Sequence, residues 1–168
     1  LVIHPINEFG SQEQKDKYLP SLIKGEKIGC FGLTESEAGS DPTSMKTSFK
    51  KTKDGYIING SKNWITNAPI ADIFIIWAIE ENKDHKSIKG FIIEKNTEGL
   101  NTSTIENKTS LKISPTGQII LNNVFVPSNL CLENTEGWKS VFSCLNKARF
   151  GISWGVLGSA TECWLIAK

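Results

Sequence analysis

The 168-residue sequence predicts an α+β fold, with an antiparallel β-sandwich or barrel between helical segments at the two ends of the chain. From Ile28 to about Val126, short runs of β-branched and aromatic residues alternate with turn pairs, a pattern typical of sandwiches and barrels. Before and after that stretch, apolar residues recur at helical spacing. The expected order along the chain is therefore helix, β-domain, helix.

The first helical segment has recognisable start and stop signals. Ser11 can accept a hydrogen bond from the helix start, and Gln14 three residues later completes a capping box. Pro20 lacks a backbone N–H, so we expect it to divide the segment into two short helices. Gly25 is a suitable residue to end the second of them.

The β-rich stretch is divided by turn residues. Asp54–Gly55 predicts a tight hairpin, and Asn59–Gly60 and Asn122–Asn123 predict two further turns. Ile73–Ile79 is apolar throughout, so we expect it to be covered on both faces, whereas Glu81–Lys89 reads as a charged surface loop. The expected strands are Ile28–Leu33, Met45–Phe49, Tyr56–Ile58, Asn63–Thr66, Ile73–Ile79, Gly90–Glu94, Gln118–Leu121 and Val124–Val126.

The last segment predicts a long helix. Asn134, Thr135 and Glu136 are typical of a helix start. Glycines within the helix lower its intrinsic propensity, so we expect them to permit close approach of a neighbouring helix or ligand. The apolar positions at helical spacing are Trp138, Val141, Phe142, Leu145, Ala148 and Ile152, and the glycines are Gly151, Gly155 and Gly158.

Composition excludes several classes of function. The 19 basic and 18 acidic residues give a net charge of +1, which argues against a nucleic-acid partner. The longest apolar run, Ile73–Ile79, is too short to span a bilayer. The four cysteines show no C-x-x-C spacing and are expected to be reduced thiols. Neither histidine has metal-ligand spacing, so no metal site is expected.

Two segments carry candidate chemistry. In Phe31–Pro42, backbone N–H groups near Gly39 and Ser40 could hold a pyrophosphate, and the alternative is an ordinary surface loop. In the second segment, Trp64 beside Thr66 could combine an aromatic wall with a hydroxyl donor for a flat heteroaromatic ring. The alternative there is a core tryptophan at a strand end.

Taken in this order, the two segments resemble the middle domain of the acyl-CoA dehydrogenase family. That family has the pattern L-T-E-x-x-x-G-S-D followed by W-I-T-N, and both stand here, as Leu33–Asp41 and Trp64–Asn67. The resemblance implies a partial chain. Residues 1–26 would end an N-terminal helical domain, 27–133 would form the middle domain that binds FAD and acyl-CoA, and 134–168 would begin a C-terminal helical domain.

The resemblance also implies residue roles at a FAD site. Thr66 would lie near flavin N5, Trp64 and Ile65 would wall the ring, and Ser40 would contact both the pyrophosphate and the CoA portion of the substrate. Glu35, next to these residues, is expected to support the geometry of the loop. The implied cofactor contacts are Phe31, Gly32, Leu33, Thr34, Gly39, Ser40, Trp64, Ile65 and Thr66.

A third segment, Cys144–Gly155, resembles the first C-terminal helix of glutaryl-CoA dehydrogenases, as His4–Ile6 resembles their N-terminal region. A polar and cationic contact to CoA would come from this helix. For Arg149 alone, a solvated helix position is the alternative. The implied substrate contacts are Ser40, Phe142, Leu145, Asn146 and Arg149.

The implied activity is FAD-dependent oxidation of glutaryl-CoA to crotonyl-CoA and CO2, as in lysine and tryptophan degradation. Electrons would pass to an electron-transfer flavoprotein, from a homotetramer in the mitochondrial matrix or the bacterial cytoplasm. The catalytic base would lie outside this chain, which alone would be inactive. Two sites depart from the family pattern: Ser36 replaces the usual proline, and Leu111–Gly117 has lysine and proline where arginine and a small residue are usual.

Two other functions fit the same residues. One is a short- or branched-chain acyl-CoA dehydrogenase that does not decarboxylate its product, since the region that binds the distal carboxylate would precede Leu1. The other is a β-domain used as a binding module without chemistry. Flavin absorbance would separate this last alternative from the enzymes.

Overall fold

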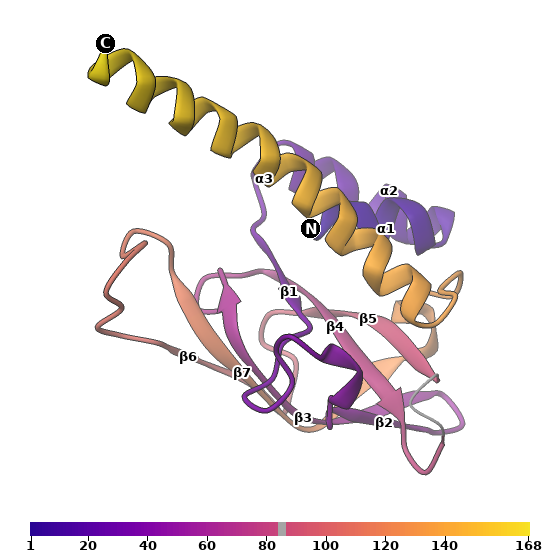
Figure 1. The fold of residues 1–168 in the computed structure, drawn as a ribbon. Coiled ribbons are helices and arrows are strands. Elements are labelled where there is room, and N and C mark those ends of the chain that lie inside the picture. The colour runs from indigo at the N-terminus through magenta and orange to yellow at the C-terminus, as the bar shows by residue number, and fades with distance from the viewer. Residues whose placement is uncertain (84–86) are drawn as a thin grey trace.

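A computed structural model describes residues 1–83 and 87–168 (Figure 1). The helices are α1 (Ile3–Phe9), α2 (Gln12–Ile23) and α3 (Trp138–Ala167), with short 3-10 turns η1 (Pro42–Ser44) and η2 (Ser128–Leu130). The strands are β1 (Gly29–Gly32), β2 (Ser48–Lys51), β3 (Gly55–Thr66), β4 (Ile73–Glu80), β5 (Ile88–Glu94), β6 (Leu100–Thr104) and β7 (Thr116–Pro127). The expected loop Glu81–Lys89 falls partly on residues 84–86, outside the described residues.

The seven strands form one mixed sheet around the central strand β4. β4 pairs with β5 on one side, and with β1 and β2 at its two ends on the other. The order continues through β2, β3 and β7 to β6. The pairs β2–β3, β3–β7, β4–β5 and β6–β7 are antiparallel as expected, whereas β1 and β2 run parallel to β4. Turn residues reveal hairpins such as β2–β3, but they carry no sign of pairing between strands distant in sequence.

Strand β4 is covered on both faces, as its continuous apolar sequence predicts. Phe74, Ile76 and Ala78 face a core enclosed by the curled sheet. Ile75 and Trp77 face a second core, shared with the helices that lie together on one side of the sheet (Figure 1). Side chains of successive strand residues point to opposite faces, so β4 joins the two cores.

The capping box at the start of α2 is confirmed. Ser11 Oγ accepts from the Gln14 backbone, and Gln14 Oε1 accepts from the Ser11 backbone. The expected break at Pro20 was wrong, because α2 runs through this residue. Proline removes one hydrogen bond, whereas burial of Tyr18 and Leu22 holds the helix against the sheet.

Strands β3 and β7 run unbroken where the sequence suggested turns. Asn59 and Asn122–Asn123 lie at a register shift between the two strands, not at hairpin ends. Asn59 Nδ2 donates to Asn123 Oδ1 at 3.1 Å, and the Asn123 backbone N–H donates to Asn59 Oδ1 at 2.8 Å. The two asparagines complete each other's hydrogen bonds, so the bulge replaces the expected turns.

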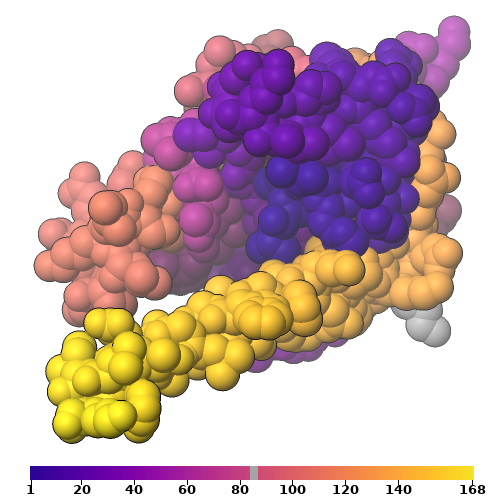
Figure 2. Space-filling model, turned by 90° about the horizontal axis from the view of Figure 1, so that it is seen from above, coloured from indigo at the N-terminus to yellow at the C-terminus, as the bar shows by residue number. Residues whose placement is uncertain are grey.

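Helix α3 begins at Trp138, two residues after the predicted start segment, because Gly137 with φ of 57° is its N-cap. Its first turns pack on α1, and its exposed second half projects beyond the rest of the chain (Figures 1 and 2). Within residues 1–83 and 87–168, none of the helices combines the length and apolar composition needed to cross a bilayer. The four cysteines are free thiols, as expected.

Candidate functional site

A cavity of about 360 Å³ lies where β1, the end of β3 and helix α3 meet. It brings together segments that are distant in the sequence, including the two candidate motifs. Its lining residues are Leu1, Val2, Gly29, Cys30, Phe31, Leu33, Thr34, Trp64, Ile65, Thr66, Asn67 and Leu145. Six of the nine predicted cofactor residues are among them, so the two motifs form one site.

A bulge in β3 turns the Trp64 side chain out of the sheet. Asn63 and Trp64 together oppose the single residue Gln118 of β7, because the register shifts between Lys62 and Ile65. Trp64 takes a φ of 60°, a left-handed conformation that is rare for a bulky side chain. Its side chain is 59% exposed, so the reading of a core tryptophan was wrong. Strain of this kind is concentrated at functional sites.

Thr34 and Thr66 offer free hydroxyl groups at this cavity. Neither hydroxyl hydrogen-bonds to another residue in the described part of the chain. The Thr34 backbone is nevertheless fixed, since its carbonyl accepts from the Asn63 N–H at 2.8 Å. Both side chains can therefore donate to a ligand without losing an internal bond.

The loop after β1 has a buried base and an exposed tip. Glu35 and Ala38 are buried and exchange two backbone hydrogen bonds. Gly39 and Ser40 are exposed and do not line the cavity. Their predicted contact with a pyrophosphate stays a prediction. Ser36, where the family usually has proline, accepts from Asn63 Nδ2 at 3.0 Å, so this departure adds a link between the loop and β3.

Helix α3 places one of its predicted substrate residues at the cavity. Leu145 lines it, whereas Phe142, Asn146 and Arg149 lie on exposed surface outside it. Arg149 Nη1 donates to Asn146 Oδ1 at 3.0 Å, so these two polar groups face solvent as a pair. Their role toward CoA stays a prediction.

A second hollow shares Trp64 and Thr66 with the first. It is organised by Lys108, which the sequence did not single out. Lys108 Nζ donates to the carbonyls of Leu111 and Ser114 at 3.0 and 2.5 Å and to Thr116 Oγ1 at 2.8 Å. This lysine holds the loop that departs from the family pattern against the end of β7.

Sequence reasoning also missed Lys62. Its side chain has no exposed surface, and its ammonium group pairs with Glu35 at 2.8 Å beneath the loop. The inward position of Lys62 on a half-buried strand could have revealed this burial. A buried ammonium there would in turn have indicated a carboxylate partner. The expectation that Glu35 supports the loop is confirmed.

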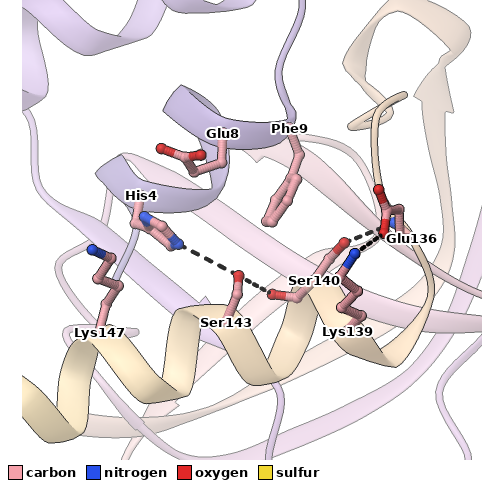
Figure 3. Close-up of a pocket in the computed structure, with 8 residues that line it drawn as sticks. All are labelled: His4, Glu8, Phe9, Glu136, Lys139, Ser140, Ser143 and Lys147. Carbon is pink, nitrogen blue, oxygen red and sulfur yellow. Dashed lines mark hydrogen bonds and ion pairs between the residues drawn. The ribbon is translucent and has the colours of Figure 1, made fainter.

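A further hollow lies between α1 and α3 (Figure 3). Its groups are largely paired with one another: Ser143 Oγ lies 3.5 Å from His4 Nε2, and Lys139 Nζ lies 2.5 Å from Glu136. Burial lowers the pKa of His4, which favours the neutral ring. None of the predicted site residues lines this hollow, so it is not the candidate site.

The cavity at Trp64 fits a planar heteroaromatic cofactor. An aromatic side chain with no ring contact to another described residue offers a face for stacking. Two free hydroxyls and the buried apolar Leu33 and Ile65 provide the mixture of donors and apolar surface that such ligands require. The residues present therefore fit a flavin ring.

Comparison with known proteins matches the chain to two domains of one family. Residues 30–124 match "Acyl-CoA dehydrogenase, middle domain", and residues 1–26 match "Acyl-CoA dehydrogenase, N-terminal domain". The chain is 41% identical over 157 residues to a short-chain-specific acyl-CoA dehydrogenase of Clostridium acetobutylicum, covering 92% of this chain and 41% of that protein. It is 39% identical to a mitochondrial short/branched-chain-specific acyl-CoA dehydrogenase of Rattus norvegicus, covering 94% of this chain and 37% of that protein.

Solved structures give the same picture. Glutaryl-CoA dehydrogenase of Mycobacterium smegmatis in complex with FADH2 is 42% identical, with a TM-score of 0.90 over 94% of this chain and 40% of that one. A glutaryl-CoA dehydrogenase in complex with glutaryl-CoA is 37% identical, with a TM-score of 0.81 over 88% and 38%. The chain thus spans about two fifths of the length of these relatives.

Proposed function

The chain belongs to the acyl-CoA dehydrogenase family, and from that premise we propose that it supplies the flavin wall of an FAD-dependent enzyme that oxidises an acyl-CoA thioester. The observation that carries this proposal is the single cavity formed by the two motifs around Trp64. The similarity of the chain to an enzyme crystallised with FADH2 supports FAD as the cofactor. When bound, FAD would accept a hydride from the substrate.

Some residues of the chain would bind the flavin, and others would polarise its ring. Trp64 would cover one face of the flavin, and Thr66 would donate a hydrogen bond to N5. Such a bond stabilises negative charge in the reduced ring. Thr34 would add a second donor, and Leu145 would close the cavity from helix α3. Proton abstraction is assigned to a residue outside this chain.

For the substrate, we propose glutaryl-CoA, with decarboxylation to crotonyl-CoA. Similarity to two glutaryl-CoA dehydrogenase structures supports this choice, and the short-chain relatives at comparable identity support the alternative of a non-decarboxylating enzyme. The intact protein, incubated with glutaryl-CoA, is expected to bleach its flavin absorbance and to release CO2. Bleaching by butyryl-CoA without CO2 release from glutaryl-CoA would favour the alternative. A purified protein that takes up no FAD would refute both.

We also propose electron-transfer flavoprotein as the electron acceptor and a homotetramer as the working assembly. The family membership supports both, and size-exclusion chromatography with light scattering would test the second. The compartment, mitochondrial matrix or bacterial cytoplasm, stays a prediction from the reduced cysteines.

Trp64→Ala is expected to weaken FAD binding by at least about tenfold, because stacking on an aromatic ring contributes about 1 kcal/mol beyond area burial. Thermal stability without FAD should change little, since the ring is 59% exposed. Fluorescence titration with FAD measures the first effect and calorimetry the second. A variant that loses stability and keeps its FAD affinity would return Trp64 to a purely structural role.

Thr66→Val is expected to slow flavin reduction by about tenfold, the effect of losing one hydrogen bond to a charged group. The volume is conserved and the hydroxyl has no partner in the described part of the chain, so the fold should be kept. Stopped-flow absorbance under anaerobic conditions measures the rate. Thr102→Val, on the exposed edge strand β6, is the matched control. Equal rates in both variants would contradict the N5 assignment.

A further inference from the structure

A buried ion pair lies under the loop of the proposed FAD site. Lys62 Nζ and Glu35 Oε1 are 2.8 Å apart, and the two side chains are 0% and 9% exposed. The same ammonium group donates to the Leu33 carbonyl at 3.1 Å and lies 3.8 Å from Met45 Sδ. Lys62 therefore reaches from the middle of β3 to the residue at which the loop begins.

Glu35 holds the other end of the same loop. Its Oε2 accepts from the Lys46 backbone N–H at 2.7 Å, and its Oε1 accepts from the Thr47 N–H at 3.0 Å. One ion pair thus holds the residues on both sides of the twelve-residue segment 34–45. Bonds from a carboxylate to backbone N–H groups are charge-assisted and stronger than neutral ones.

The next residue of β3 extends this link to the aromatic wall. The Asn63 backbone N–H donates to the Thr34 carbonyl at 2.8 Å, and its side chain donates to Ser36 Oγ at 3.0 Å. Trp64 follows directly in the bulge. The loop and the wall of the site are therefore attached to the same three residues of β3.

We propose that Lys62 and Glu35 are positioning residues: their ion pair fixes the loop against β3, so that both walls of the cofactor site are in place before FAD binds. The identity of the ligand rests on the proposed function, whereas the fixing of the loop does not. Apolar residues of equal volume often stabilise a fold as well as a buried ion pair does. Unlike apolar residues, the ion pair fixes the geometry of the loop, since each charged group binds specific backbone atoms.

The electrostatics agree with a charged pair. Burial alone would raise the pKa of Glu35, but Lys62 and the donors from Thr47 and Lys46 bring it below the usual value. Burial lowers the pKa of Lys62, and Glu35 opposes that shift. The pKa of Lys62 is lowered although its partner is a carboxylate. The reason is that the ammonium has no exposed surface and loses more hydration than the carboxylate of Glu35.

Lys62→Met in the intact protein tests the proposal, because methionine nearly matches the lysine in volume and lacks its charge. Hydrogen exchange without FAD should show faster exchange at the Lys46, Thr47 and Asn63 amides than in wild type, with core amides of β4 unaffected. FAD affinity, from fluorescence titration, should fall at least about tenfold. Lys51→Met, which removes the half-exposed Lys51 from its pair with Glu80, is the matched control and should change neither.

A variant that lacks both charges separates positioning from stability. Glu35→Gln with Lys62→Met leaves no unpaired buried charge, so it should fold even if the single variant does not. It should still show rapid loop exchange and weak FAD binding, because the Leu33 carbonyl has lost its donor. Wild-type exchange and affinity in this double variant would overturn the proposal.

The wild-type protein provides an independent test. Without FAD, the Lys46 and Thr47 amides should already be protected, and their exchange at the rate of an unstructured chain would overturn the proposal. If the wild type takes up no FAD, the proposed function fails. The exchange rates of the FAD-free protein then still decide whether the pair fixes the loop.

Discussion

Glu35→Ala is expected to lower the free energy of unfolding by about 3–5 kcal/mol, the usual cost of leaving one partner of a buried ion pair without the other. Within residues 1–83 and 87–168, the Lys62 ammonium would keep only the Leu33 carbonyl as a close oxygen acceptor, and it has no exposed surface. The Lys46 and Thr47 N–H groups would lose their acceptor as well. Urea unfolding of the intact protein at pH 7 measures the change.

Glu37→Ala is the control for this prediction. Glu37 belongs to the same loop and pairs with Lys46, but both side chains are largely exposed, so no measurable loss is expected. Equal losses in the two variants would show that the loop as a whole, and not the buried charge, determines stability.

The pH dependence of Glu35→Ala gives a second measurement. Burial lowers the pKa of Lys62 from its usual value of 10.5 to about 8. Between these two pH values, the unfolded state therefore binds more protons than the folded state. Stability contributed by this group must therefore rise with pH across that window. Without Glu35 to oppose the shift, the window begins at lower pH. The deficit of the variant relative to wild type should therefore shrink as the pH rises toward about 8, the pKa of Lys62 in the wild type, and should stay constant above it.

Sequence reasoning succeeded where a local pattern determines local structure. The Ser11 capping box, the Asp54–Gly55 hairpin and the double burial of Ile73–Ile79 are all present, because each depends on neighbouring residues or on the continuity of an apolar run. The motif residues Thr34 and Trp64 also meet in one cavity, although their meeting was expected from the family resemblance and not from spacing.

The errors share a physical cause. Asn59–Gly60 resembles a turn, and only the complementary Asn123, 64 positions away in the sequence, allows it to be a bulge. Lys62 resembles a surface lysine, and only Glu35 on a distant loop allows its burial. In both cases the deciding partner is remote in sequence, and no local propensity contains it.

Gly60→Ala is expected to destabilise the protein by about 3–5 kcal/mol through backbone strain and overpacking together. Gly60 has a φ of 143°, a conformation that side chains rarely adopt. An added Cβ would lie 2.6 Å from the Thr47 Cα and 2.5 Å from its Oγ1, so backbone must move. Gly39→Ala is the control, since its Cβ would meet no described atom within 4 Å.

The effect of Gly60→Ala should reach the cofactor site, because Thr47 is the residue it displaces. The Thr47 N–H donates to Glu35, so moving Thr47 loosens the end of the loop that Glu35 holds. We expect weaker FAD binding together with the lower stability, measured by titration at a temperature where the variant is folded. Lower stability with unchanged FAD affinity would show that the loop keeps its position without Thr47, and that Lys62 alone is sufficient to hold it.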